Sequence, residues 1–410
     1  MLVVEDSPLY SSDFFADGDP WAYLAGLREN NPVSVHRRAD GYEFHALTRY
    51  DDVRAAYIDH ESLSSSYGTM VDGSYRAERD SASGRMLIVA DEPAHGAIKK
   101  PIKTGGFNRD MVARIGEAVR RNIRESFAGL SVGDRIDFTR DIAPGLPKGV
   151  LEILFGIGPA DAASLLEATR TMIGYRDQAY TGVQPLDALV DAQLEVLDFM
   201  DDLLERRIAS GEDDDLIGML AQLVASGGMT RDVALLNGLN VAVGGNETTP
   251  HTASLTVDTI HREPAQWAKV VDGEVPVDVA TAEFLRWTST NSYVQRLAVR
   301  DFRVGDEVIP EGSFVTLWNM SANRDAAVFD RPDKFLVDRA DNKQIAFGAG
   351  VHRCIGAPVA TLEIQMFVEE LAAWDKAFTV VAPPQRLRSN FMLGLTELEV
   401  EVVKAGDAGA

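Results

Sequence analysis

The one cysteine of the chain, Cys354, is the side chain best placed to carry chemistry. It lies in the loop of residues 347–356 (FGAGVHRCIG), which contains three glycines and directly precedes a predicted helix. Glycines let a backbone approach a flat ligand closely, and a helix N-terminus stabilises a thiolate. The loop therefore predicts a sulfur that carries negative charge. The alternative is an inert buried cysteine, because free cysteines are commonly buried.

A second segment, residues 244–250 (GGNETTP), interrupts a long apolar helical pattern. In a helix interior each glycine costs about 1 kcal/mol relative to alanine, and a proline costs about 3 kcal/mol. Pro250 cannot donate to the carbonyl of Asn246, so we expect a kink near Glu247 and Thr248. Breaches of local rules in a consistent element are often functional. The alternative is a tolerated kink beside a buried, satisfied carboxylate.

The loop of residues 347–356 matches the pattern Phe-x-x-Gly-x-His-x-Cys-x-Gly, so the chain resembles the cytochrome P450 superfamily of the bacterial, ferredoxin-dependent type. Five residue types at fixed spacing rarely coincide by chance. The resemblance implies that Cys354 is the axial ligand of haem b, that Phe347 packs near the sulfur, and that His352 lies near a haem propionate. A thiolate ligand donates electron density to the iron and favours O–O cleavage.

The resemblance also assigns roles to two other segments. It makes Thr248 and Glu247 the catalytic pair, a hydroxyl and an acid that relay protons during oxygen activation. Glu283 and Arg286 lie three residues apart on one predicted helix face, a spacing that usually marks a surface contact. In the family this pair joins a downstream arginine, here Arg339, in a structural triad that holds the cysteine loop.

Three basic side chains match positions that bind haem propionates in the family. His95 follows the stretch Asp91-Glu92-Pro93-Ala94, and Lys99 stands where an arginine is usual. Lysine keeps the charge but loses the bidentate fork of arginine. Arg296 matches another propionate-binding arginine. For His95 alone, an ordinary surface histidine is the alternative.

The elements that must position these residues are mostly helical. The pattern is helical from about Asp51 to residue 290, and it includes a helix from about Thr230 to His261 that is apolar on most sides. Such a helix spans roughly 45 Å and should run through the middle of the fold. A final helix is predicted from about Pro358 to Trp374. Short strands follow residue 290, and Asp40-Gly41 predicts a hairpin turn between residues 33–35 and 42–44.

The fold class expected is therefore mainly α with small β-sheets (α+β), with the cytochrome P450 fold and a long central helix over the haem. The chain has no repeat or linker that would divide it, so one domain over residues 1–410 is predicted. It lacks about 18 consecutive apolar residues and a signal-like start, which predicts a soluble, cytoplasmic protein.

Composition excludes several classes of protein. The 410 residues carry a net charge of −23, which argues against nucleic acid or an anionic membrane as the main partner. Because there is one cysteine, an internal disulfide, a cysteine-based zinc knuckle and a cysteine-ligated iron–sulfur cluster are excluded within one chain.

The sequence contains no flavin or nicotinamide module, so electrons must come from outside. The resemblance implies a ferredoxin with its ferredoxin reductase, docking near the cysteine side. A local basic patch there would have to steer docking against the negative net charge. Its candidate members are Lys99, Lys100, Lys103, Lys343 and Arg353.

The resemblance implies that the chain inserts one atom of O2 into a mainly apolar small molecule, in secondary metabolism or catabolism. Terpenoid, steroid, polyketide and peptide-derived substrates remain open, as do hydroxylation, epoxidation and coupling. The region from about Ser62 to Ala90 should line the pocket, together with segments farther along the chain. The individual candidates for substrate contact are Ile88, Val89, Val241, Gly244, Val294, Phe391 and Met392.

Three other classes of function compete with a monooxygenase. A non-catalytic haem sensor or electron-transfer protein needs no proton relay, so Glu247 and Thr248 count against it. A peroxide-driven peroxygenase would more often lack the threonine. A hydrolase that uses Cys354 as its nucleophile would leave the other segments unexplained.

Overall fold

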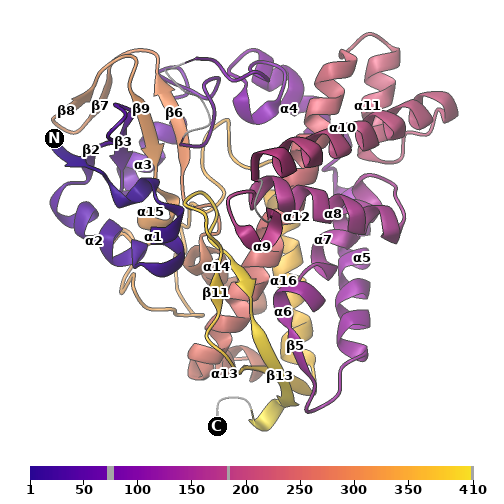
Figure 1. Cartoon of the computed structure of the whole chain (residues 1–410). Helices are drawn as coiled ribbons and strands as arrows, with labels where there is room; N and C mark the ends of the chain where they lie inside the picture. Colours follow the sequence, from indigo (N-terminus) through magenta and orange to yellow (C-terminus); the bar gives the residue numbers. More distant parts are fainter. Residues whose placement is uncertain (72–77, 182–184, 408–410) are drawn as a thin grey trace.

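The computed structural model describes residues 1–71, 78–181 and 185–407 (Figure 1). In the view of Figure 1 the N-terminal strands lie on the left, the outer helices α5, α7, α8, α10 and α11 lie on the right, and α12 runs between them. The main helices of this layout are α4 (Ala94–Gly105), α5 (Arg109–Ala128), α7 (Gly145–Leu154), α8 (Pro159–Ile173), α10 (Pro185–Ser210), α11 (Leu216–Ala225) and α16 (Ala357–Ala373).

Helix α12 (Arg231–Arg262) has 32 residues and spans about 48 Å. It contacts α7, α8, α10, α14 (Val277–Thr288) and α16, so the predicted central helix is confirmed. The helix continues through Pro250. Several of its buried hydroxyl groups are satisfied within the helix: Ser254 donates to the carbonyl of Pro250 at 2.8 Å, and Thr256 donates to that of Thr252 at 2.8 Å. Back-bonding of this kind lets hydroxyl side chains occupy a buried helix.

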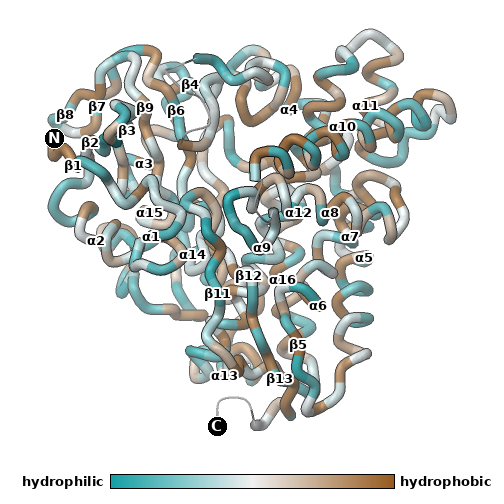
Figure 2. The backbone as a smooth tube through the Cα atoms, in the orientation of Figure 1, coloured by the Kyte–Doolittle hydropathy of each residue, from teal (hydrophilic) through white to brown (hydrophobic). Residues whose placement is uncertain are grey.

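Helix α10 shows how the outer helices pack, and the helices not yet named are short or lie near the ends of the chain. Figure 2 shows apolar and polar residues alternating along α10, as expected of an outer helix with one buried face. In α10 the buried side is formed by Val196, Met200, Leu203 and Leu204. The other helices are α1 (Ser12–Asp17), α2 (Pro20–Asn30), α3 (Tyr50–Ile58), α6 (Phe138–Asp141), α9 (Gln178–Thr181), α13 (Pro264–Val271) and α15 (Asn319–Ala322).

A six-stranded sheet with the order β1-β2-β3-β9-β6-β4 occupies the N-terminal side. Strands β2 (Val33–Arg37) and β3 (Glu43–Leu47) pair antiparallel with Val35 opposite His45, which confirms the predicted hairpin and fixes its register. The other strands of this sheet are β1 (Leu2–Glu5), β4 (Leu63–Ser64), β6 (Val294–Ala298) and β9 (Phe314–Leu317). Smaller sheets are formed by β5 (Arg135–Asp137), β7 (Phe302–Val304), β8 (Glu307–Ile309), β10 (Lys376–Val380), β11 (Gln385–Arg386), β12 (Leu395–Glu397) and β13 (Glu399–Lys404).

Among the helices that the structure describes, no single one combines the length and apolar content needed to cross a membrane. One bent pair, residues 138–154 with residues 159–173, meets that test only when its two parts are taken together.

The predicted triad of Glu283, Arg286 and Arg339 is confirmed and fully buried. The Glu283 carboxylate accepts from Arg286 Nε at 2.7 Å and from Arg339 Nε at 2.9 Å. Arg286 Nη1 also donates to the carbonyls of Asn323 and Pro332, at 2.7 and 3.0 Å. These bonds attach α14 to the segment that leads into the cysteine loop.

Candidate haem site

The cysteine loop is shaped by two glycines with positive φ, Gly348 at +66° and Gly350 at +67°. A Cβ atom on Gly350 would lie 2.6 Å from the carbonyl oxygen of Tyr57, so a side chain there would clash with α3. The N–H of Cys354 donates to the carbonyl of Phe347 at 3.0 Å. Glycine is thus required both for the turn and for the close approach to α3, whereas the sequence had suggested close approach to a flat ligand.

The Cys354 thiol is solvent-accessible, yet it is closely surrounded by protein, and burial is the main cause that raises its pKa. Both observations hold for a side chain that faces an interior space rather than the outer surface. The backbone N–H groups of Gly356 and Ala357 and the charges of Arg353 and Lys99 oppose the rise in pKa. A metal cation bound to the sulfur would lower the pKa of Cys354 further, in the same direction as these groups, and would favour the thiolate.

One face of α12 borders open space in the middle of the molecule. Gly244 is exposed although its helix is central, and a Cβ atom added there or at Gly245 would meet no atom within 4 Å. Thr248, one turn later, is also partly exposed, and its hydroxyl donates to the Gly244 carbonyl at 3.4 Å. Val241, one turn earlier on the same face, is buried. This face has room for a ligand where the helix carries small residues.

Basic side chains gather beside the cysteine loop. The rings of His95 and His352 lie 4.2 Å apart between centroids, and both residues are strongly desolvated. Burial, with Arg296, His95 and Lys99 nearby, lowers the pKa of His352 to about 2. Burial also lowers the pKa of the Arg296 guanidinium. The charged forms of these desolvated groups would be stabilised by an anion, and haem propionates supply two carboxylates.

Lys99 connects α4 to the cysteine loop. Its ammonium donates to the carbonyl of Arg353 at 3.0 Å and, more closely, to the carbonyl of Val351. The lysine that stands in the place of the family's arginine therefore binds the loop backbone in this structure. His95, on the same helix, has Nδ1 3.3 Å from a carboxylate oxygen of Glu92.

A serine contact with His352 was not predicted from the sequence. Ser65 Oγ lies 3.1 Å from His352 Nε2, and the Ser65 N–H donates to Asp91 Oδ1 at 2.8 Å. Ser66 Oγ also donates to Asp91, at 2.8 Å. A serine-rich stretch after β4 has no recognisable pattern, and only the tertiary structure brings it to the loop 287 residues away.

Glu247 is buried and directed toward α8. Its Oε1 accepts from the hydroxyl of Thr169 at 3.1 Å. Burial raises the pKa of Glu247 to about 7, while Arg170 and Thr169 act in the opposite direction. A cavity of about 10 Å³, bordered by Glu247, Arg170, Tyr180 and His251 among others, lies beside it. That volume accommodates about one water molecule.

A second buried carboxylate, Glu363, was missed by the sequence analysis. It lies on α16, where its Oε2 accepts from the hydroxyl of Thr249 on α12 at 3.1 Å and its Oε1 has no hydrogen-bond partner. Burial raises the pKa of Glu363 to about 8. A signal was present, since a glutamate at this helical spacing from Val359 and Phe367 falls on the apolar face.

The candidates for substrate contact fall in three places. Val241 and Gly244 share a face of α12, as described above. The tip containing Phe391 and Met392 pairs with Asn291 and Ser292, close to Val294 in the chain, through a β-bridge and a 3.0 Å backbone hydrogen bond.

The third place is the region of residues 62–90, of which residues 72–77 lie outside the described part of the chain. In it, Val89 is buried, whereas the side chain of Ile88 is 44% exposed.

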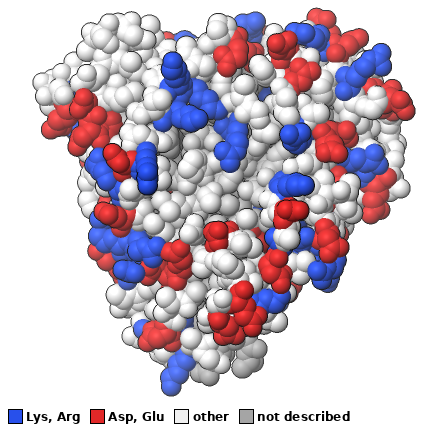
Figure 3. Space-filling view, turned by 180° about the vertical axis from the view of Figure 1, so that it is seen from behind, with Lys and Arg blue, Asp and Glu red and all other residues white. Residues whose placement is uncertain are grey.

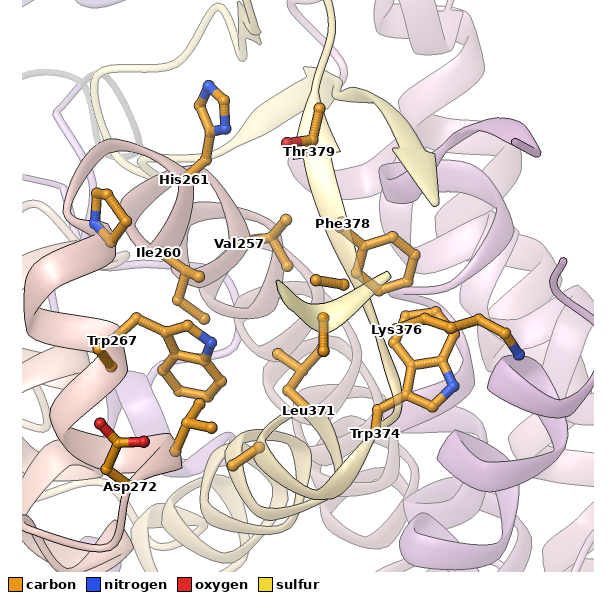
Figure 4. A pocket seen from close by; sticks show the side chains of 16 residues that line it. Val257, Ile260, His261, Trp267, Asp272, Leu371, Trp374, Lys376, Phe378 and Thr379 are labelled. Atoms are coloured by element: carbon orange, nitrogen blue, oxygen red, sulfur yellow. The ribbon is translucent and has the colours of Figure 1, made fainter. Parts of the chain in front are cut away.

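A cavity of about 200 Å³ lies elsewhere (Figure 4). It is bordered by the C-terminal part of α12 together with α13, α16 and β10, and Trp267, Trp374 and Phe378 form much of its wall. None of the predicted site residues lines it, so it is separate from the cysteine loop and its basic neighbours.

Comparison with known proteins gives consistent matches along the chain. A family model described as cytochrome P450 matches residues 277–386. The methyl-branched lipid omega-hydroxylase of Mycobacterium tuberculosis is 30% identical, over 97% of this chain and 95% of that protein. The linalool 8-monooxygenase of Pseudomonas putida is 28% identical, over 98% of this chain and 100% of that protein. The crystal structure of P450 OxyD, involved in the biosynthesis of vancomycin-type antibiotics, superposes with a TM-score of 0.87 at 28% identity, covering 96% and 98% of the two chains.

Fold, cysteine loop and matches together define a haem-dependent monooxygenase. The chain belongs to the cytochrome P450 family, and its cofactor is haem b, which this family binds through a cysteine thiolate. Its reaction uses O2, a substrate and an electron-donating partner.

Glu363 should make stability depend on pH. Its pKa is raised from 4.5 to about 8 by burial, so its contribution to stability is present below pH 4.5 and is lost as the pH rises through about 8. Between pH 4.5 and about 8, the protonation of Glu363 in the folded state should make the free energy of unfolding fall by up to about 1.4 kcal/mol per pH unit. We expect Glu363→Gln to flatten the decline, as measured by urea unfolding at several pH values.

The exposed Glu274 provides the matched control, because Glu274→Gln should leave the pH profile of unfolding unchanged. Equal profiles for the wild type and Glu363→Gln would contradict the assignment of a neutral, buried acid at this position.

Proposed function

We propose that residues 1–410 form a single monooxygenase domain in which Cys354 is the axial ligand of the haem iron. The observation that carries the proposal is the accessible, enclosed thiol of Cys354 at the N-terminus of α16, with a desolvated basic cluster beside it. When bound, the haem supplies the iron that activates O2, and thiolate ligation favours cleavage of the O–O bond.

Four side chains would hold the haem propionates: Arg296, His95 and His352 directly, and Lys99 by charge while it fixes the loop backbone. Arg296 is suited to this task because its guanidinium is buried, with a 2.7 Å hydrogen bond from Nη1 to the carbonyl of Gln295 and with Asp91 as an opposite charge that acts on it. Phe347 would pack next to the sulfur, since its carbonyl already accepts from the Cys354 N–H.

Thr248 and Glu247 are proposed as the catalytic pair. The hydroxyl of Thr248 faces the open side of α12, and its 3.4 Å bond to Gly244 is long enough to be exchanged for another acceptor. Glu247, with a pKa near 7, holds a proton at neutral pH and can release it. Its contact with Thr169 and the one-water cavity supply a route for reprotonation from the far side of the helix.

The substrate is proposed to be a mainly apolar molecule bound along the exposed face of α12. Val241, Gly244, Val294, Phe391, Met392, Ile88 and Val89 would contact it. The names of similar proteins point the same way, because linalool, steroids and methyl-branched lipids are all mainly apolar. A role in secondary metabolism or catabolism is consistent with these relatives.

We propose a ferredoxin with its reductase as the electron donor, in the cytoplasm. Lys100, Lys103, Lys343 and Arg353 are all exposed, whereas Lys99 is partly buried by its bonds to the loop. Figure 3 shows Lys and Arg side chains gathered on the upper part of the face that is hidden in Figure 1. Such local positive charge can attract an acidic partner despite the net charge of −23.

The ligand assignment is tested by reducing the purified protein, adding carbon monoxide and recording the Soret band. We expect a strongly red-shifted band, because carbon monoxide opposite a thiolate absorbs at longer wavelength than carbon monoxide opposite histidine. Cys354→Ala should lose that band. A band at the position typical of histidine-ligated haem in the wild type would overturn the assignment of Cys354.

The role of Glu247 is tested by the pH dependence of turnover. An acid with a pKa near 7 is protonated below that pH, so turnover limited by its proton should fall as the pH rises through about 7. Glu247→Gln should reduce product formation by about 10²-fold and abolish that decline. Product and O2 consumption would be measured with a ferredoxin system, using a substrate found by a spectral binding screen.

Here the exposed Glu311 serves as the control, since Glu311→Gln should leave rate and profile as in the wild type. Substrate oxidation at an unchanged rate in Glu247→Gln would remove Glu247 from the catalytic pair. Binding of O2 without any product, across the whole screen, would favour a haem sensor or electron carrier instead.

The docking proposal predicts that Lys100→Glu combined with Lys103→Glu slows reduction by ferredoxin, because charge reversal weakens the attraction. Stopped-flow reduction at low and high ionic strength would measure this. The defect should shrink as salt screens the charges. An unchanged rate at low salt would contradict a docking surface on α4.

A further inference from the structure

Residues 81–89 form a loop that folds on itself before α4. The N–H of Gly84 donates to the carbonyl of Val89 at 3.1 Å, and the N–H of Met86 donates to that of Ala82 at 3.0 Å. The loop ends in a single 3₁₀ turn, Leu87–Val89. With its backbone bonded internally, it can move as one piece.

One side chain of α12 fastens this loop. Asn237 Oδ1 accepts from the N–H of Leu87 at 2.9 Å, and its Nδ2 donates to the carbonyl of Arg85 at 2.8 Å. The second Nδ2 hydrogen serves the carbonyl of Val233, one turn earlier in α12, at 2.7 Å. Asn237 is completely buried, so both ends of its amide are used where water is excluded.

A surface ion pair is the other polar link from the loop to α12. Arg85 Nη1 lies 3.0 Å from Asp232 Oδ2, and both side chains are about half exposed. Among the described residues, no other hydrogen bond or ion pair joins residues 81–89 to another helix or to a strand. Exposed pairs contribute little to stability, so Asn237 provides the main polar attachment of the loop, in addition to the packing of the buried Leu87 and Val89 side chains.

The position of Asn237 along α12 connects the loop to the open face. Val241, Gly244 and Thr248 follow it by four, seven and eleven residues and therefore lie on the same side of the helix. The loop covers the end of that side, and it carries Ile88 and Val89, two of the proposed substrate contacts.

We propose that Asn237 is a positioning residue that holds residues 81–89 closed over the substrate end of α12 and so controls the entry of bulky ligands. Asparagine suits this task because its amide offers one acceptor and one donor to a backbone N–H and a backbone carbonyl of the loop. Alanine would leave both loop groups without partners, whereas aspartate would keep the acceptor for Leu87. The inference rests on the proposed function, since it requires the haem to lie beside the same face.

The test uses holoenzyme and two azoles that bind the haem iron directly, imidazole and the larger 4-phenylimidazole, with stopped-flow detection of the Soret shift. Asn237→Ala should raise both the association and dissociation rates of 4-phenylimidazole about tenfold, because two buried hydrogen bonds no longer hold the loop. Rates for imidazole and for carbon monoxide should change less than twofold. A structural defect at the haem would alter all three ligands alike.

Arg85→Met is the matched control, since it removes the ion pair and leaves the Asn237 bonds in place. It should change the 4-phenylimidazole rates less than twofold. Equal effects of Arg85→Met and Asn237→Ala, or unchanged rates in Asn237→Ala, would overturn the proposal.

Hydrogen exchange at the Leu87 amide separates this proposal from that of the haem site. Exchange should be faster in Asn237→Ala than in the wild type or Asn237→Asp, with protection of α12 and α16 retained. This readout requires neither a thiolate ligand nor activity, so it would still decide the role of Asn237 if the carbon monoxide band were not red-shifted. If Asn237→Ala does not fold, Asn237→Asp takes its place, with loss of the bond to Arg85 and an intermediate rise in rates expected; wild-type rates would overturn the proposal.

Discussion

The buried carboxylate of Glu283 is the interaction on which the position of the cysteine loop depends. It binds two guanidinium groups that are themselves withdrawn from water, and Arg286 and Arg339 use their remaining N–H groups on backbone carbonyls of residues 323–334. Asn323, at the start of that segment, accepts from the N–H of Ile345, two residues before the loop. A buried charge stripped of its partner is costly, so this arrangement tolerates little movement. The position of Cys354, next to the N-terminus of α16, is therefore fixed.

Helix α12 meets a different constraint, because it must be buried and polar at once. Several of its hydroxyl groups bond to carbonyls of the preceding turn, and two buried carboxylic acids accept from threonine hydroxyls beside it. Glu247 contacts α8 on one side, and Glu363 of α16 contacts Thr249 on the other. Burial raises the pKa of both acids, so each can hold a proton near neutral pH in the interior. The glycines at 244 and 245 leave space next to this proton-bearing stretch.

The basic groups near the loop would give a negatively charged protein a place for a dianionic cofactor. Desolvation is the main cause that lowers the pKa values of His95, His352 and Arg296, nearby positive charges add to it for the two histidines, and an anion placed among them would favour the charged forms. Lys99, in the same place, has a different role. Its ammonium donates to two backbone carbonyls of the cysteine loop, and a compact ammonium with three N–H donors is well suited to bind both.

The sequence by itself determined the helix-rich fold, the central helix and the first hairpin, while the cofactor and the buried triad were implied by the family resemblance that its motifs carry. These rest on local patterns: fixed motif spacing, hydrophobic periodicity and turn residues, all of which are legible within a few turns of chain. Only the tertiary structure decided that Ser65 meets His352, that Lys99 bonds to the loop backbone, that Thr169 meets Glu247 and that Asn237 fastens residues 81–89. The partners in these contacts lie 78 to 287 residues apart, and several are backbone groups that every residue possesses. No residue type or spacing marks such a contact in advance, because it arises where two separately folded segments happen to be packed together.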